Sequence, residues 1–266
     1  MVVRSVRGLE MAYDEAGSGV PVVLLHGFPF NRTLWRDQVE SLSASHRVVT
    51  PDLRGFGESS VGAEDAATME EMARDVAALM DELKIERAII GGLSMGGYVA
   101  LAFCRQFARR VRALILADTR PQSDTEEGRQ NREVMARRAL DEGMGAIAEA
   151  MLPKLLAPAT HMKNPQAVAR VRDMILSTRT EAAAAALRGM AVRQDQTNFL
   201  QNILQPTLIV VGSEDQLNPP ADSETMRREI RGSRLEVIEG AGHVSNVERP
   251  KEFNAALTKF LKDLQP

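Results

Sequence analysis

A serine flanked by glycines, in the segment Gly92-Leu93-Ser94-Met95-Gly96, is the first group in this chain that could perform covalent chemistry. A short apolar, β-branched run (88–90) precedes this G-x-S-x-G pattern, and a helix-compatible run (98–107) follows it. The pattern therefore predicts a strand that turns sharply into a helix, with Ser94 at the apex. Glycine suits both flanking positions, because a Cβ there would collide with neighbouring backbone. Ser94 is thus a candidate nucleophile.

A serine hydroxyl is a poor nucleophile at neutral pH and needs a base, for which imidazole, with a pKa near 6.5, is the natural group. Of the four histidines, His243 is the expected base, because the glycines of segment 240–244 would let a loop bring its ring over a sheet edge. His26 ends an apolar run, and a structural hydrogen-bonding role is expected for it. His46 lies in a polar segment and is expected at the surface. His161 is also expected there, with a ligand-facing position as the alternative.

The histidine in turn needs a carboxylate that fixes its tautomer and stabilises the imidazolium. Asp215 is the expected acid because it follows the apolar run 207–212 closely, whereas the alternation would point Glu214 away. Asp118, which follows the preceding strand, is the reserve candidate. The resulting order along the chain is serine, acid, histidine, as in enzymes with a nucleophile elbow.

Apolar runs alternate with helix-like segments along the chain, which indicates an α/β fold with a mostly parallel sheet covered on both faces. An edge hairpin that turns near Gly8 is expected first. The further strand candidates are residues 21–25, 47–50, 88–90, 111–116, 207–212 and 234–238, and the helix candidates include 31–42, 68–83 and 250–264. Sites in such sheets lie at the carboxyl ends of the strands. The residues that follow strands should therefore converge on one edge: His26, Ser94, Asp118 and Asp215.

The composition changes between Arg120 and about Gln196, where β-branched runs give way to alanine, methionine and arginine. Helix-start patterns predict three or four helices there, at Ser123 with Glu126, at Asn164-Pro165, and at Thr178 with Glu181. We therefore expect a core of residues 1–119 and 197–266 and a helical insert of residues 120–196.

The insert carries arginines and methionines whose positions decide the character of any pocket beneath it. Arginines on a charged helix are expected to face solvent, and methionines are expected mostly in the core. Methionines in the pocket would favour an apolar ligand, whereas arginines there would suit a dicarboxylate. The arginines are Arg120, Arg129, Arg132, Arg137 and Arg138, and the methionines are Met135, Met144, Met151, Met162, Met174 and Met190.

Length, charge and cysteine content limit the class of protein. The 266 residues suit one large domain, or a core with an insertion. The net charge is −3 and acidic and basic residues are interspersed, so neither nucleic acid nor a membrane is an expected partner. The single cysteine, Cys104, excludes an internal disulfide and suits a reducing compartment. The first 17 residues show no signal-peptide core, and no apolar run is long enough to span a membrane. A cytoplasmic protein is expected.

The sequence contains no motif that is typical of a cofactor site. The segment Asp52–Ser59 contains a Gly-x-Gly pair, but it lacks the third glycine of a dinucleotide site and does not lead straight into a helix, so a structural role is expected. Neither a Cys/His cluster with metal-ligand spacing nor a phosphate loop occurs. We expect no cofactor and no metal.

Taken together, these motifs resemble the α/β-hydrolase fold family along essentially the whole chain. The resemblance implies that the amides of Phe28 and Met95 hold the oxyanion, and that the helical insert is a cap between the strand ending at Asp118 and the strand starting at Thr207. The residues that carry it are His26-Gly27, Asp52-x-Arg54-Gly55-x-Gly57-x-Ser59, Gly92 to Gly97, Gly212-x-x-Asp215 with Pro219, and Gly242-His243.

A serine at the elbow argues against the dehalogenase and epoxide-hydrolase branches of this family, which carry aspartate there. The segment Gly-Leu-Ser-Met-Gly-Gly is similar to that of enol-lactonases, carbon–carbon hydrolases and cofactor-free perhydrolases. We expect a serine hydrolase that cleaves carboxylic esters of small to medium apolar groups through an acyl-enzyme, with lactones second. A ligand receptor or signalling protein with vestigial hydrolase activity is the alternative from another class. An inert scaffold is disfavoured by the full set of serine, acid and histidine.

Overall fold

An eight-stranded sheet with the order β1-β2-β4-β3-β5-β6-β7-β8 forms the centre of the molecule. β1 and β2 form the expected edge hairpin, β2 pairs antiparallel with β4, and the remaining pairs are parallel, so the predicted α/β fold class is confirmed. The strands are β1 (Val2–Val6), β2 (Leu9–Ala16), β3 (Val20–Leu25), β4 (His46–Pro51), β5 (Ala88–Leu93), β6 (Val111–Ala117), β7 (Thr207–Gly212) and β8 (Arg234–Ile238). This computed structural model describes residues 1–264, so the last two residues of the expected core, 265 and 266, lie outside the described residues.

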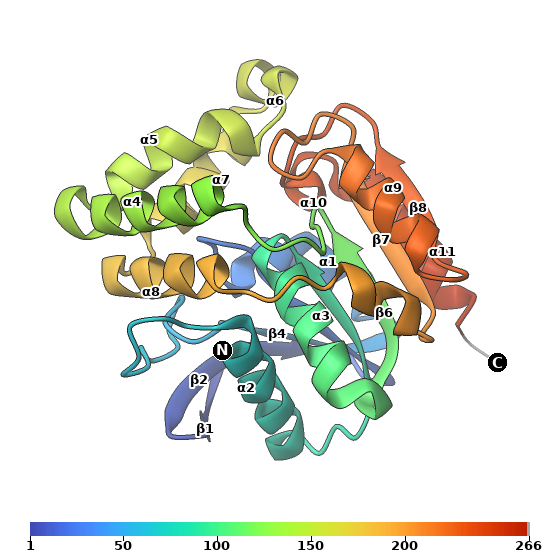
Figure 1. Cartoon of the computed structure of the whole chain (residues 1–266). Helices are drawn as coiled ribbons and strands as arrows, with labels where there is room; N and C mark the ends of the chain where they lie inside the picture. The colour runs from blue at the N-terminus through green and yellow to red at the C-terminus, as the bar shows by residue number, and fades with distance from the viewer. Residues whose placement is uncertain (265–266) are drawn as a thin grey trace.

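Helices cover both faces of the sheet, and a group of five further helices lies across one of its ends (Figure 1). β5 and β7 are buried at every position, which explains their unbroken apolar sequences. Within residues 1–264, no helix is long and apolar enough to cross a membrane. The helices flanking the sheet are η1 (Arg32–Trp35), α1 (Arg36–Leu42), α2 (Met69–Glu82), α3 (Met95–Phe107), η2 (Ala108–Arg110), η3 (Thr197–Asn202), α9 (Pro220–Glu229), α10 (Ser245–Glu248) and α11 (Pro250–Lys262).

The insert contains five helices rather than the three or four that were predicted. We call them the helical layer: α4 (Glu126–Glu142), α5 (Met144–Leu155), α6 (Pro158–Lys163), α7 (Pro165–Leu176) and α8 (Thr180–Ala191). α9 was also missed, because its segment contains one buried apolar side chain, Met226, and therefore shows no helical periodicity.

Two of the predicted helix starts within the helical layer are wrong. α7 begins as expected, with the side chain of Asn164 accepting from the Ala167 amide and proline at the first position. α4, however, is capped by Thr125, whose hydroxyl accepts from the Gly128 amide, and not by Ser123. Thr178 does not cap α8 because its hydroxyl donates to the Pro29 carbonyl instead, at 2.7 Å. A tertiary contact thus displaces the local cap.

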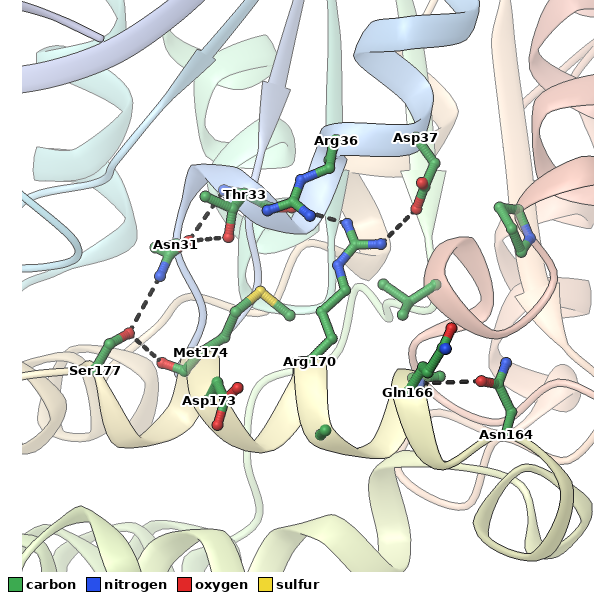
Figure 2. A pocket seen from close by; sticks show the side chains of 14 residues that line it. Asn31, Thr33, Arg36, Asp37, Asn164, Gln166, Arg170, Asp173, Met174 and Ser177 are labelled. Carbon is green, nitrogen blue, oxygen red and sulfur yellow. Dashed lines mark hydrogen bonds and ion pairs between the residues drawn. The ribbon is translucent and has the colours of Figure 1, made fainter.

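The helical layer is held to the core by polar contacts from α7 and α8. Arg170 of α7 donates to the Asp37 carboxylate at 2.5 Å and to the Thr33 carbonyl at 2.9 Å (Figure 2). It also donates to the Leu34 carbonyl at 3.2 Å. Arg179, just before α8, donates to the Gly55 carbonyl at 2.7 Å. The Asp52–Ser59 loop therefore supports the helical layer, as its expected structural role requires.

Candidate active site

Ser94 lies at a sharp corner between β5, which ends at Leu93, and α3, which begins at Met95. Its backbone angles are φ 56° and ψ −116°, in the left-handed half of φ space that residues with a Cβ rarely occupy. The Ser94 carbonyl accepts from the Gly97 amide at 2.9 Å and from the Thr119 hydroxyl at 2.8 Å, which fix the corner. Such local strain persists only where the surrounding structure enforces it, and it is concentrated at functional sites.

The glycines around Ser94 are required by close backbone contacts, as the sequence predicts. A Cβ on Gly92 would run into the carbonyl of Gly96, and one on Gly96 would run into the carbonyls that end β3. A Cβ on Gly27 would lie 3.2 Å from the Ser94 Cβ, so the turn after β3 packs directly on the serine. This contact brings the Gly27-Phe28 segment beside Ser94.

The two amides expected to hold an oxyanion belong to Phe28 and Met95. Met95 is the first residue of α3, and the first amides of an α-helix have no partner within the helix. Phe28 follows Gly27 and lines the same cavity as Ser94. Both residues are therefore close to the serine in the chain or in space, as this role needs.

His243 and Asp215 form a buried pair. His243 Nδ1 lies 2.8 Å from Asp215 Oδ2, and the two side chains are 2% and 0% exposed. The other carboxylate oxygen of Asp215 accepts from the amides of Leu217 and Asn218 at 2.8 and 3.0 Å. The carboxylate is thus fixed in place, and the Nε2 of His243 is the ring nitrogen left for chemistry.

Burial alone lowers the pKa of His243, but the charge and hydrogen bond of Asp215, aided by Asp118 and Glu248, outweigh it and raise the pKa above 6.5. Asp118 lies behind this pair. Burial, and then the neighbouring charge of Asp215, raise the pKa of Asp118 well above its usual range. Asp118 accepts from the Ser245 hydroxyl at 2.5 Å and from the Gly212 amide at 2.8 Å, so its carboxyl braces the neighbouring strand and helix.

Ser94 and His243 line one cavity of about 270 Å³ between the core and the helical layer. Its walls combine apolar side chains, among them methionines, with four charged residues besides the histidine: three cations and one carboxylate. Asp215 stands behind His243, outside the lining. The lining residues are Phe28, Ser94, Tyr98, Arg120, Asp124, Gly128, Asn131, Arg132, Met135, Ala150, Met151, Lys154, Met190, Leu217, Asn218 and His243.

The expectation that the insert arginines face solvent is wrong for two of them. Arg120 and Arg132 line the cavity because both bind Asp124, each at 2.9 Å. Arg193 binds the same carboxylate at 2.8 Å. Burial raises the pKa of Asp124, but the guanidinium groups of Arg193 and Arg132 outweigh it and hold that pKa far below its usual range. No local pattern indicates this cluster, because its centre, Asp124, has the sequence context of an ordinary polar residue before a helix.

The methionines of the insert divide between core, cavity and solvent. Met135, Met151 and Met190 line the cavity beside Ser94, whereas Met144 is buried in the core. Met162 is exposed.

The other three histidines do not line the cavity of Ser94 and His243. His26 is fully buried and accepts from the Leu53 amide at 3.0 Å through Nε2, the structural role expected for it. His161 is at the surface, as expected. The expected exposure of His46 is wrong, because β4 begins at this residue and buries it against the sheet beside Val20.

Among residues 1–264, no three His, Cys, Asp or Glu side chains are grouped as a metal site would require. A second, open cavity of about 730 Å³ lies between α7 and the η1–α1 segment, where Arg36, Arg170 and Asp173 face it (Figure 2). It is separate from the cavity lined by Ser94 and His243.

Comparison with known proteins gives matches over nearly the whole chain. Residues 20–250 match the α/β-hydrolase fold family. A thermophilic esterase from Thermogutta terrifontis, solved with malate bound, has a TM-score of 0.96 and 42% identity, with 100% of this chain and 99% of that chain covered. The enol-lactonase from Burkholderia xenovorans LB400 has a TM-score of 0.91 and 30% identity, covering 98% and 100%. The 3-oxoadipate enol-lactonase 1 of Acinetobacter baylyi is 30% identical over 244 residues, 92% of this chain and 89% of that protein.

Proposed function

This chain belongs to the α/β-hydrolase fold family, and we propose that it hydrolyses carboxylic esters of small to medium apolar acyl or alcohol groups. One observation carries the proposal: a serine at a strained strand–helix corner shares a cavity with a histidine whose other ring nitrogen is held by a buried carboxylate. The esterase and enol-lactonase relatives support the same class of reaction.

In the proposed reaction, the Ser94 oxygen attacks the ester carbonyl while His243 Nε2 takes its proton. Asp215 keeps the proton on Nδ1 and stabilises the imidazolium. The imidazolium then gives its proton to the departing alcohol, leaving an acyl group on Ser94. A water molecule, deprotonated by the same histidine, releases the acid and restores the serine. We assign the oxyanion-binding role to the amides of Phe28 and Met95.

We propose that residues 120–196 act as a cap over this reaction. α4, α5 and α8 supply half of the cavity lining, including Met135, Met151 and Met190. Covering the reacting groups with these helices reduces the access of water, which strengthens the polar interactions that remain. The volume of the cavity and the methionines in its wall suit an acyl or alcohol group of moderate length.

A panel of esters and lactones graded in length and charge tests the proposal. Short and medium neutral esters should turn over, and a fluorophosphonate should label Ser94 in the parent protein. Labelling of Ser94 without steady turnover of any member would contradict the proposal and favour the receptor alternative.

Lactones or esters that carry a carboxylate are the second candidate, because Arg120, Arg132 and Lys154 face the cavity with a single acid, Asp124. Lys154→Met is expected to lower kcat/KM for a monoester of a short dicarboxylic acid by about fivefold, the factor that ~1 kcal/mol gives for a solvent-accessible charge pair. The neutral ester of the same chain length should be unaffected. Lys163→Met, at an exposed lysine of α6 outside the cavity lining, is the matched control. An equal loss on both esters would count against a carboxylate-binding role.

Ester hydrolysis is expected to decline on the acid side with a midpoint above pH 6.5, the ordinary pKa of a histidine. The base works only as neutral imidazole, and the carboxylates around His243 raise its pKa above 6.5. At pH 6.5 kcat/KM should therefore be less than half of its plateau value, which a profile from pH 5 to 9 on a neutral ester measures. The midpoint should not change with the leaving group. A midpoint below 6.5 would contradict the raised pKa.

A further inference from the structure

We propose that Glu248 is a positioning residue that ties the helical layer to His243, an inference that rests on the proposed function of that histidine. Glu248 ends α10, five residues after His243, and its carboxylate accepts hydrogen bonds from two parts of the chain. Oε1 accepts from the Gly242 amide, next to the histidine, at 2.7 Å. Oε2 accepts from the Ala157 amide at 2.8 Å and from the Thr160 hydroxyl at 2.6 Å, both in the helical layer.

The histidine loop and the α5–α6 connection are also in direct backbone contact. The His243 amide donates to the Leu155 carbonyl at 2.9 Å. A Cβ on Gly242 would lie 2.7 Å from the Ala157 nitrogen and 2.9 Å from the Leu156 carbonyl carbon, so a larger residue has no room there. Residues 155–157 are at most 1% exposed. This connection therefore lies directly on the loop that carries the proposed base.

A buried carboxylate is costly unless its oxygens are hydrogen-bonded, and Glu248 is only 3% exposed. Burial raises its pKa, while the three donors oppose that shift. If the α5–α6 connection and α6 moved away from the histidine loop, Glu248 would lose two of its donors and the His243 amide would lose its acceptor. The loop would then lose the contacts that fix its backbone, and the imidazole would move relative to Ser94. The position of α5 and α6 and the orientation of the His243 ring are thus coupled through the Glu248 side chain and the backbone contact between His243 and Leu155.

Arg170 provides a matched comparison, since it also holds the helical layer to the core. Its partners are Asp37 and the carbonyls of Thr33 and Leu34, none of which belongs to the histidine loop. A variant at Arg170 therefore weakens attachment of the layer without touching the contacts of Gly242 or His243.

The experiment compares Glu248→Gln, Thr160→Val, Thr160→Ser and Arg170→Met for kcat, KM, the rate of fluorophosphonate labelling and the midpoint of thermal unfolding. Glu248→Gln should lower kcat and the labelling rate by up to about 10²-fold, the cost of a misplaced catalytic group, with KM changed by less than about twofold. Thr160→Val should lower kcat by a smaller factor in the same direction, and Thr160→Ser, which keeps the hydroxyl, should restore it. Arg170→Met should lower the thermal midpoint and leave kcat near the parent value.

Equal losses of kcat in Glu248→Gln and Arg170→Met would overturn the inference, as would a Glu248→Gln variant that changes only the thermal midpoint. If Glu248→Gln does not fold, the Thr160 pair decides: equal kcat in Thr160→Val and Thr160→Ser would overturn the inference. The proposed function fails separately, if Ser94→Ala or His243→Ala keeps the parent turnover.

Discussion

Replacing Ser94 with alanine is expected to abolish ester hydrolysis, with a loss on the order of 10⁶ in kcat, the effect of removing the nucleophile from a serine–histidine–acid set. The substitution removes only the hydroxyl oxygen, and the backbone corner between β5 and α3 stays fixed by the contacts of the Ser94 carbonyl. The cavity should therefore still bind substrate, and the loss should fall on kcat. Initial rates on a chromogenic short-chain ester measure it.

A matched control is Ser223→Ala, because Ser223 of α9 is fully buried and lies outside the cavity. That variant should keep the parent kcat. Fluorophosphonate labelling should disappear from Ser94→Ala and persist in Ser223→Ala. Residual turnover above about one per cent in Ser94→Ala would identify another nucleophile, since that is far more than binding and oxyanion stabilisation alone supply.

Local sequence rules predicted the parts of this fold that depend on short-range sterics. The tight elbow at Ser94 requires glycine at positions 92 and 96, because a Cβ there would meet backbone a few residues away or at the end of the adjacent strand. The spacing of these glycines therefore predicted the elbow from the sequence. Parallel strands that are buried on both faces have nearly continuous apolar sequences, so β5 and β7 could also be predicted from the sequence. The hydrogen bond between His243 and Asp215 joins two loops whose places follow from strands ending at one edge.

Features that depend on residues far away in the chain, or on burial, could not be predicted from the sequence. Arg120 and Arg132 turn into the cavity because Asp124 is buried there, and nothing in the local pattern shows that burial. Thr178 has the sequence of a helix cap, yet it donates to Pro29, which is far away in the chain. The local sequence does not indicate the role of Glu248, because two of its three donors come from residues 157 and 160, which precede β7 and β8 in the chain. Tertiary contacts decided each of these cases against local propensity.

Asp215→Asn is expected to lower kcat by roughly 10⁴ with little change in folding. An asparagine can still accept from the amides of Leu217 and Asn218, so the turn after β7 should survive. Its NH₂ group would then face His243 Nδ1, where only an acceptor supports the working tautomer. The imidazole would carry its proton on the wrong nitrogen, and the charge formed during attack on the ester would lose its counterpart. The rate on the same neutral ester, with a thermal unfolding midpoint, separates this effect from loss of fold.

Asp118→Asn tests whether the acid has been assigned to the correct residue. Asp118 is equally buried and carries charge near His243, but its oxygens bind Ser245 and the Gly212 amide and not the imidazole. Because neither of its oxygens bonds to the imidazole, the asparagine leaves the tautomer of His243 in place and should cost far less than the change at Asp215. If Asp118→Asn instead reduces kcat more than Asp215→Asn does, with both proteins folded, the proton of His243 is oriented from β6 and not from β7. The proposed mechanism would then need a different acid, although Ser94 and His243 would keep their roles.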